Sequence, residues 1–397
     1  MDEHDLPRQA SIALMTDLKR NANLDLLRAA AISMVVVYHL IQNSPVWQPG
    51  LMQVVVFGQF GVDLFFVLSG WLIGRLYWKE HARFGSVAVL RFWARRWMRT
   101  IPPYLVALSL AWLAVFVERS QPFDFGYLAF IQNYYHTIPF FVVSWSLCIE
   151  EHFYLLIPLL LVWGARDKRY GFALFTLLIV IAPICRTLFV STDGAITEFV
   201  YTHTATHLRM EGLLLGFIAA CLPNHSNALM LSLQEKSRWL IGFFIVAFSV
   251  FIILPPLLRY RLGLTILPLG FMALLIWLVG RKPSGFASSR LIRWLAISSY
   301  SVYLTHTSII QVALKLIRRV PAAPWQMYFP LALALIGIGG WGFYQAVERT
   351  SISLRDRWIT RRQGVGITAG RLATPNGAFE ASELSLVSQS TTSSREI

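Results

Sequence analysis

Residues 24–42 read LDLLRAAAISMVVVYHLIQ, a mostly apolar run that contains three ionisable side chains, Asp25, Arg28 and His39. The run is about long enough to cross a hydrocarbon core of roughly 30 Å as a helix. An ionisable group inside an apolar helix is expensive, so each one requires a partner or a function. This stretch therefore predicts a membrane-spanning helix that carries a polar stripe.

The whole chain has the composition of a membrane protein. Hydrophobic residues make up 56% and charged residues 14% of its 397 residues, and the mean hydropathy is +0.55. Soluble domains carry about 25% charged residues. The apolar runs are continuous, so they fit helices better than barrel strands. The sequence predicts an all-α, polytopic transmembrane bundle. Its net charge of +14 is more typical of cytosolic loops near anionic lipid than of nucleic-acid binding.

About ten apolar runs are candidate spans. Their approximate limits are 24–42, 54–78, 103–118, 139–163, 171–190, 205–222, 239–258, 262–280, 291–312 and 328–347. Lys and Arg gather in every second connection, at 79–102, 164–170 and 281–290. By the positive-inside rule, this asymmetry predicts that both chain ends lie in the cytosol. Three basic residues fall outside in this scheme, and we expect them on an interfacial amphipathic helix: Lys315, Arg318 and Arg319.

The two ends of the chain are expected to lie outside the bundle, which takes up residues 24–350. Residues 1–23 are acidic in places and have no long apolar stretch, so they predict a cytosolic segment and not a secretory signal. Residues 351–397 predict a cytosolic tail that is first basic and then, over 363–397, rich in Ser, Thr, Gly and Ala and disordered. No internal repeat or second soluble domain is recognisable.

The polar stripe of the first span follows from helix geometry. Arg28 and His39 are eleven residues apart, which is three full turns plus about 20°, so both point from one face. They are separated by roughly 16 Å along the axis. Asp25 lies one turn below Arg28 on nearly the same stripe. Alternatively, Asp25 and Arg28 are interfacial anchors and His39 bonds a neighbouring helix.

A second polar cluster lies within residues 145–154, which read WSLCIEEHFY. Ser146, Glu150 and Tyr154 are spaced by four and share one helix face. A carboxylate at this depth requires a cation or a donor from another helix. The cluster is either part of a functional site or a buried structural pair.

The third cluster is a basic loop that reads RRWMRTIPPY over residues 95–104. Arg95, Arg96 and Arg99 predict a cytosolic anion site suited to phosphate, although positive-inside charge alone explains many such loops. Before it, Ser69 and Gly70 approach the cytosolic end of the second span. Gly70 permits close backbone approach, either for a neighbouring helix or for a ligand.

Further ionisable residues are expected toward the outside. His207, Arg209 and Glu211 begin the sixth span, and His306 lies in the ninth. A single polar residue near a helix end is more often a packing group, which makes His306 the weaker candidate. The three cysteines lie singly in apolar runs and have no metal-ligand spacing, so we expect no metal site.

Taken together, these segments resemble the membrane acyltransferase-3 family, bacterial enzymes that O-acylate surface sugars, lipids and some small molecules. Five elements occur in the family's order: Arg28 with His39, Phe65-Phe66 with Ser69-Gly70, Arg95 to Tyr104, Trp145 to Tyr154, and Ser299 to His306. Each is weak alone, and the ordered set is specific. Two features depart from the pattern. Thr350 follows Glu348-Arg349 where Pro is usual, and no extracytoplasmic hydrolase-like domain is appended.

The resemblance implies an acyltransferase domain over 24–350, located in the cell inner membrane. It implies transfer of an acyl group, acetyl in the first place, from cytosolic acyl-CoA to a hydroxyl of a surface carbohydrate, glycolipid or related acceptor. Acyl-CoA would be a co-substrate, and no resident cofactor is expected. Whether a separate extracytoplasmic partner takes part is left open. The implied catalytic residues are His39, Glu150 and Arg28. Those implied to bind coenzyme A are Arg95, Arg96, Arg99, Ser69 and Gly70. Those implied to bind the acceptor are Trp145, Ser146, Tyr154, His207, Arg209 and His306.

Several roles remain open at this level. His39 is a general base or a transient acyl carrier. Arg28 orients the coenzyme arm or stabilises developing negative charge. Glu150 holds the histidine tautomer or binds the acceptor. A proton-coupled transporter also uses buried His and Glu, but its usual repeated halves and broken helix pairs are missing. A structural subunit would not require a polar stripe.

Overall fold

A computed structural model describes residues 21–44, 50, 55–84, 88–135, 137–164, 168–189, 203–225, 232, 237–320 and 325–358. The expected N-terminal segment, apart from its last three residues, and the expected disordered tail lie outside this part of the chain. The chain separates into two units, Met1–Ser351 and Ile352–Ile397. Of the second unit, residues 352–358 are described and are helical.

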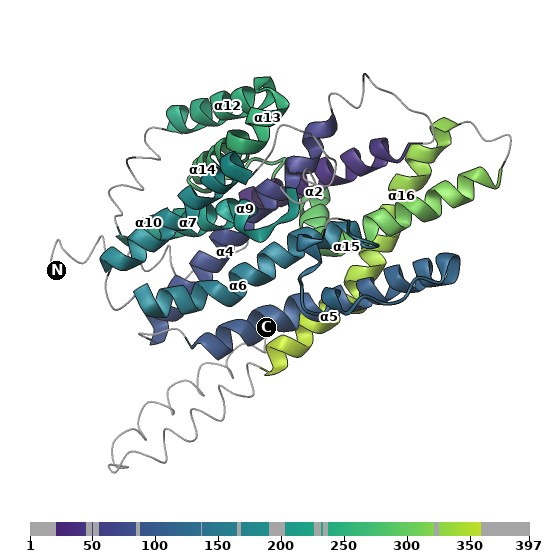
Figure 1. The fold of residues 1–397 in the computed structure, drawn as a ribbon, viewed down its shortest axis with the longest axis horizontal. Coiled ribbons are helices and arrows are strands. Elements are labelled where there is room, and N and C mark those ends of the chain that lie inside the picture. The colour runs from purple at the N-terminus through teal and green to yellow at the C-terminus, as the bar shows by residue number, and fades with distance from the viewer. Residues whose placement is uncertain are drawn as a thin grey trace, which may run out of the picture. The chain divides into compact units, whose positions relative to one another are not determined.

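The first unit is built from helices, and its described residues contain no strand. Its longer helices are α2 (Ala22–Gln42), α4 (Gly61–Phe84), α5 (Val89–Arg119), α6 (Trp145–Gly164), α7 (Lys168–Phe189), α10 (Glu211–His225), α12 (Ser237–Ile253), α14 (Leu264–Val279), α15 (Arg290–Arg318) and α16 (Tyr328–Phe343). Short turns complete it, among them α9 (Thr206–Arg209), α13 (Pro256–Leu258) and the 3-10 helix Val56–Phe60. The helix pairs that pack most extensively are α4 with α10, α15 with α16, α15 with α2, and α12 with α14 (Figure 1).

The helices agree with the predicted fold class. Each of the ten predicted runs overlaps a helix, and among the described residues six helical segments are long and apolar enough to span a membrane. These six are Ala22–Gln42, Val56–His81, Val89–Arg119, Val142–Leu161, Pro256–Val279 and Tyr328–Trp358. Three shorter apolar helices lie at Phe175–Leu188, Glu211–Leu222 and Arg238–Ile253. The all-α class is confirmed, whereas the number of ten spans and the orientation stay predictions.

The predicted basic loop is wrong, because residues 95–104 are helical. α4 continues to Phe84 and α5 begins at Val89, so the connection is much shorter than 79–102. Pro102 and Pro103 lie inside α5 and do not start it. Membrane helices tolerate proline where neighbouring groups satisfy the backbone. Polar side chains bind the backbone just before the prolines: Thr100 Oγ1 donates to Arg96 O at 3.2 Å, and Tyr300 OH donates to Thr100 O at 2.9 Å.

The helix of the fourth predicted run begins at Trp145 and not near residue 139. Two features of the preceding chain delay it: Pro139 lacks an N–H, and Phe141 has a φ of 52° in the left-handed region. The 3-10 turn Val142–Ser144 then leads into α6. Trp145 consequently starts the helix that carries Glu150.

Glycines set the contact between α4 and α10. A Cβ built on Gly70 would lie 2.0 Å from the Leu213 carbonyl oxygen, and one on Gly216 would lie 2.0 Å from that of Val67. These helix backbones therefore touch in the manner of small-residue membrane crossings. Of the two roles left open for Gly70, the structure shows contact with a neighbouring helix. Ser69, one residue earlier, faces a cavity instead.

Candidate active site

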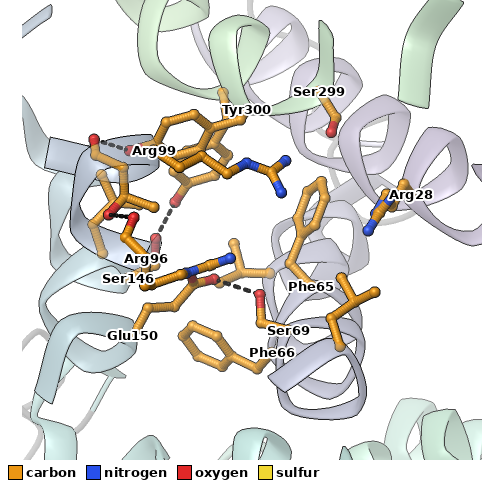
Figure 2. A pocket seen from close by; sticks show the side chains of 15 residues that line it. Arg28, Phe65, Phe66, Ser69, Arg96, Arg99, Ser146, Glu150, Ser299 and Tyr300 are labelled. Carbon is orange, nitrogen blue, oxygen red and sulfur yellow. Dashed lines mark hydrogen bonds and ion pairs between the residues drawn. The ribbon is translucent and has the colours of Figure 1, made fainter. Parts of the chain in front are cut away.

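A cavity of about 90 Å³ lies between α2, α4, α5, α6 and α15 (Figure 2). Its apolar lining residues are Val62, Phe65, Phe66, Leu72 and Leu147. Its polar lining residues are Arg28, Ser69, Arg96, Arg99, Thr100, Ser146, Glu150, Ser299, Tyr300 and Tyr303. Three guanidinium groups and one carboxylate line the space, which makes it suited to an anionic or strongly polarised ligand.

Glu150 is the centre of a hydrogen-bond network at the wall of the cavity. Its Oε1 accepts from Ser69 Oγ at 3.1 Å. Its Oε2 accepts from Tyr154 OH at 2.5 Å and from Arg96 Nη2 at 3.3 Å. Arg96 also donates to Tyr154 OH, and its guanidinium carbon lies 4.1 Å from the centre of the Tyr154 ring. The predicted shared face of α6 and the required cation are both present, and the cation is Arg96.

The three arginines predicted to form one anion site point to different places. Arg95 lies 3.8 Å from Glu80, which also pairs with Arg91 at 3.7 Å. Arg96 and Arg99 line the cavity. Arg99 lies 3.9 Å from Glu348, which in turn accepts a hydrogen bond from Ser301 at 2.6 Å. Adjacent residues on a helix are rotated by about 100°, which separates Arg95 from Arg96 once this segment is helical.

Arg28 reaches the cavity from the side opposite Arg99 (Figure 2). Its guanidinium pairs with the Asp25 carboxylate at 3.7 Å, as their one-turn spacing predicts. His39 is not among the cavity-lining residues. It lies on the same stripe of α2, roughly 16 Å farther along the axis. The stripe therefore joins the cavity to a half-buried histidine.

His39 contacts a second histidine, His306, on α15. The His306 Nε2 atom lies 3.3 Å from His39 Nδ1, and the two ring centres are 4.9 Å apart. His39 Nδ1 also lies 2.9 Å from the carbonyl oxygen of Val35. His306 is fully buried, and its Nδ1 lies 2.8 Å from Tyr303 O and 3.1 Å from Val302 O. The structure thus joins the first and the last of the five motifs.

The remaining predicted residues lie away from the cavity lining. Buried Arg209 pairs with Asp63 at 3.1 Å, and its guanidinium carbon is 5.6 Å from the centre of the Trp145 ring. His207 stacks on Tyr134 with ring centres 5.9 Å apart. Trp145, Arg209 and His207 therefore do not line the cavity, whereas Ser146 at the start of α6 does.

A family profile described as "Acyltransferase domain", Acyl_transf_3, matches residues 21–344. The chain belongs to the acyltransferase-3 family. The resemblance seen in the five motifs is thereby confirmed, and so is its classification among acyltransferases. Membership in this family lends no support to the transporter alternative.

Similar proteins of known name come from Staphylococcus aureus. "O-acetyltransferase OatA" of strain NCTC 8325 / PS 47 is 28% identical over 319 residues, which cover 72% of this chain and 50% of the relative. A protein of strain COL named "Putative O-acetyltransferase" is 32% identical over 218 residues, covering 50% of this chain and 34% of the relative. The chain thus spans between a third and a half of the length of these relatives. No solved structure matches this fold at a significant level.

Several residues of the cavity were missed by sequence reasoning. Ser299, Tyr300 and Tyr303 line it from α15, and Tyr303 OH lies 2.6 Å from Ser146 Oγ. They belong to the motif that ends at His306, so the motif contained the signal, but only its histidine was assigned a role. Thr100 was also missed, and its Oγ1 donates to Glu151 Oε1 at 2.9 Å.

Proposed function

We propose that this chain is a multi-pass O-acyltransferase of the cytoplasmic membrane. It would move an acetyl group from acetyl-CoA to a hydroxyl of a surface carbohydrate, glycolipid or related acceptor. The observation that carries this proposal is the polar stripe of α2, which connects an arginine-lined cavity at Arg28 with a half-buried histidine, His39. The names of the relatives favour acetyl as the acyl group.

The donor, acetyl-CoA, would bind at the cavity. Arg28, Arg96 and Arg99 line one small space, and coenzyme A carries phosphates and polar amides that guanidinium groups bind well. The long arm of the thioester would then extend along α2 toward His39. With the predicted orientation, both chain ends and the end of α2 that carries Arg28 face the cytosol, where acyl-CoA is made.

The geometry supports one of the two roles considered for Arg28, orientation of the donor. Electrostatic stabilisation of a developing oxyanion requires donors roughly 3 Å from it. Arg28 is roughly 16 Å from His39 along the helix. It is therefore suited to orienting the donor and not to stabilising charge at His39. Glu150 binds Ser69, Arg96 and Tyr154. These contacts support a role in fixing Arg96 at the donor site or in contacting a substrate over a role in holding the His39 tautomer.

The reaction itself would take place at His39. Its imidazole removes the proton from the acceptor hydroxyl while the oxygen attacks the thioester carbonyl. The C–S bond breaks, and the departing thiolate takes up the same proton to give free coenzyme A. A variant of this route passes the acetyl group through the imidazole nitrogen before it reaches the acceptor. The final transfer would be made by this chain directly or through a separate extracytoplasmic partner.

The experiment is expression of the gene in a bacterium without a related enzyme, followed by mass spectrometry of ester-linked acetyl groups on surface glycans and lipids. Purified protein in liposomes is assayed in parallel for release of the coenzyme A thiol from acetyl-CoA. We expect gain of acetyl esters with the native chain and loss with His39→Gln, by a factor of about 10² to 10⁴ in rate. Glutamine keeps bulk and hydrogen bonding but takes up no proton near neutral pH.

His81→Gln is the matched control, because it makes the same exchange near the end of α4, away from the cavity lining. Both variants are compared at equal yield and equal elution from a sizing column. Near-native transfer by His39→Gln would overturn the assignment of the reacting centre to this stripe.

A further inference from the structure

Backbone carbonyls fix the protons of the two facing histidines. A carbonyl oxygen only accepts hydrogen bonds, so the imidazole nitrogen beside it must carry the proton. His39 Nδ1 lies 2.9 Å from Val35 O, and His306 Nδ1 lies 2.8 Å from Tyr303 O. In their neutral forms, both rings are therefore protonated on Nδ1 and carry a lone pair on Nε2.

This assignment of protons shows which imidazole donates and which accepts in the hydrogen bond between the two rings. His306 Nε2 faces His39 Nδ1 at 3.3 Å, so His306 accepts and His39 donates. The His39 N–H is shared between the imidazole of α15 and the Val35 carbonyl one turn below it. Within the described part of the chain, no hydrogen bond occupies the other nitrogen of His39, Nε2, which keeps its lone pair for a substrate.

We propose that His306 is the positioning residue of His39: its Nε2 accepts the Nδ1 proton and so holds the His39 ring with Nε2 as the reactive nitrogen. The proposal rests on the proposed function and deepens it. When His39 Nε2 takes the hydroxyl proton, the imidazolium positive charge spreads to Nδ1–H, and the hydrogen bond to His306 strengthens. When the thiolate recovers that proton, both rings return to their starting tautomers.

His306, which accepts the hydrogen bond from His39, is unusual in this role because it is a neutral ring and not a carboxylate. The ionisable side chains that contact the pair are phenols: the Tyr38 ring centre is 4.9 Å from that of His39, and the Tyr303 ring centre is 5.8 Å from that of His306. Among the described residues, no carboxylate contacts either imidazole. A buried carboxylate here would require its own cation, whereas a buried neutral imidazole needs only the hydrogen bonds that Val302 and Tyr303 provide.

The test compares two amides that differ in reach. In His306→Gln, the amide oxygen reaches the position of the imidazole Nε2 and accepts the proton of His39. In His306→Asn, the amide ends near the position of Nδ1 and leaves His39 Nδ1–H without its partner on α15. Each purified variant is placed in liposomes with radiolabelled acetyl-CoA, and kcat and KM are measured from release of coenzyme A thiol and from transfer of label.

We expect His306→Asn to lower kcat by about 10- to 100-fold at nearly constant KM, since general-base efficiency contributes factors of this order. His306→Gln should recover most of this loss, to within about fivefold of the native kcat. Equal activity of the two variants, whether both high or both low at native folding, would overturn the proposal. If His39→Gln abolishes transfer and His306→Asn does not, this inference fails while the proposed function stands. If His39→Gln is active, the proposed reacting centre fails first.

Discussion

Two of the arginine–glutamate pairs among the described residues, Arg186–Glu211 and Arg96–Glu150, differ in burial and in hydrogen bonding although each joins neighbouring helices. Arg186 and Glu211 join α7 to α10, with 0% and 2% of their side chains exposed and a shortest separation of 2.5 Å. Arg96 and Glu150 join α5 to α6, each with 14% exposed and 3.3 Å apart. We call them the closed pair and the cavity pair.

The closed pair uses its hydrogen-bonding capacity fully. Arg186 donates through Nε to Arg261 O at 3.2 Å, through Nη1 to Leu208 O and Glu211, and through Nη2 to Glu211 and Thr265. Thr265 Oγ1 in turn donates to Glu211 Oε1 at 2.6 Å. Such complete satisfaction is what a buried charge requires to remain in a low-dielectric interior.

The cavity pair keeps unused capacity. Glu150 divides its oxygens among Ser69, Arg96 and Tyr154. Among the residues that the structure describes, no acceptor reaches the buried Arg96 Nε. A buried polar group without a partner is rare in native proteins, and a functional role is one explanation for it. We therefore expect the closed pair to contribute stability and the cavity pair to contribute to ligand binding.

The largest expected effect comes from opening the closed pair. Arg186→Ala leaves Glu211 buried without its cation, which costs about 3–5 kcal/mol of stability. The measurement is thermal unfolding of the purified protein in detergent, together with the yield of monodisperse protein. Activity should fall only as far as the folded fraction falls.

Removal of both charges is the control for this change. Arg186→Met combined with Glu211→Leu should recover most of the lost stability, since apolar residues of similar volume often replace a buried pair without penalty. Full activity of the double variant would place the closed pair outside the reaction. A double variant that is stable but inactive would contradict the division between the two pairs.

The cavity pair should respond in the opposite way. Glu150→Gln keeps hydrogen bonds for Ser69 and Tyr154 but removes the charge opposite Arg96. A charged hydrogen bond is worth about 1.5–3 kcal/mol. We expect kcat/KM for acetyl-CoA to fall by about 10- to 150-fold, which is this range converted to a rate ratio. The unfolding temperature should change little, because the site is partly open to solvent.

Glu211→Gln provides the matched exchange in the closed pair. It should lower the unfolding temperature clearly and change kcat/KM of the remaining folded protein little. If Glu150→Gln lowers the unfolding temperature as much as Glu211→Gln does, the cavity pair is structural, and the proposed donor site loses its main anionic member.

The spacing of residues along single helices was sufficient to predict which side chains of the candidate site share a helix face. The stripe of Asp25, Arg28 and His39 and the shared face of Glu150 and Tyr154 follow from residues at most eleven positions apart on one helix. The structure retains both sets, with Asp25 beside Arg28 and Tyr154 beside Glu150. Hydropathy likewise predicted the helical class, because apolar runs of this length have few other solutions in a membrane.

The pairings between helices were beyond sequence reasoning. His39 and His306 are 267 positions apart, and Asp63 and Arg209 are 146 apart, so no helical period connects them. The prolines of α5 were a further source of error. The sequence pattern places them at the end of a loop, whereas α5 runs through both of them. In the structure, Arg95 pairs with Glu80, Arg96 with Glu150 and Arg99 with Glu348, so the three arginines do not form one anion site.

The smallest expected effect tests this separation directly, with two arginines of one helix. Arg99 lines the cavity, whereas Arg95 lies against Glu80 away from it. Arg99 is also 36% exposed, so its contact with a donor phosphate is worth only about 1 kcal/mol. Arg99→Gln should therefore raise the KM for acetyl-CoA by about fivefold at nearly constant kcat.

Arg95→Gln removes the same charge four residues earlier and should leave the KM for acetyl-CoA near its native value. The pair of variants separates site-specific binding from general attraction, because a diffuse positive field would weaken by the same amount in both. Equal increases in KM that disappear at high salt would indicate such a field. An increase confined to Arg99→Gln would identify the cavity side of α5 as the face that meets the donor.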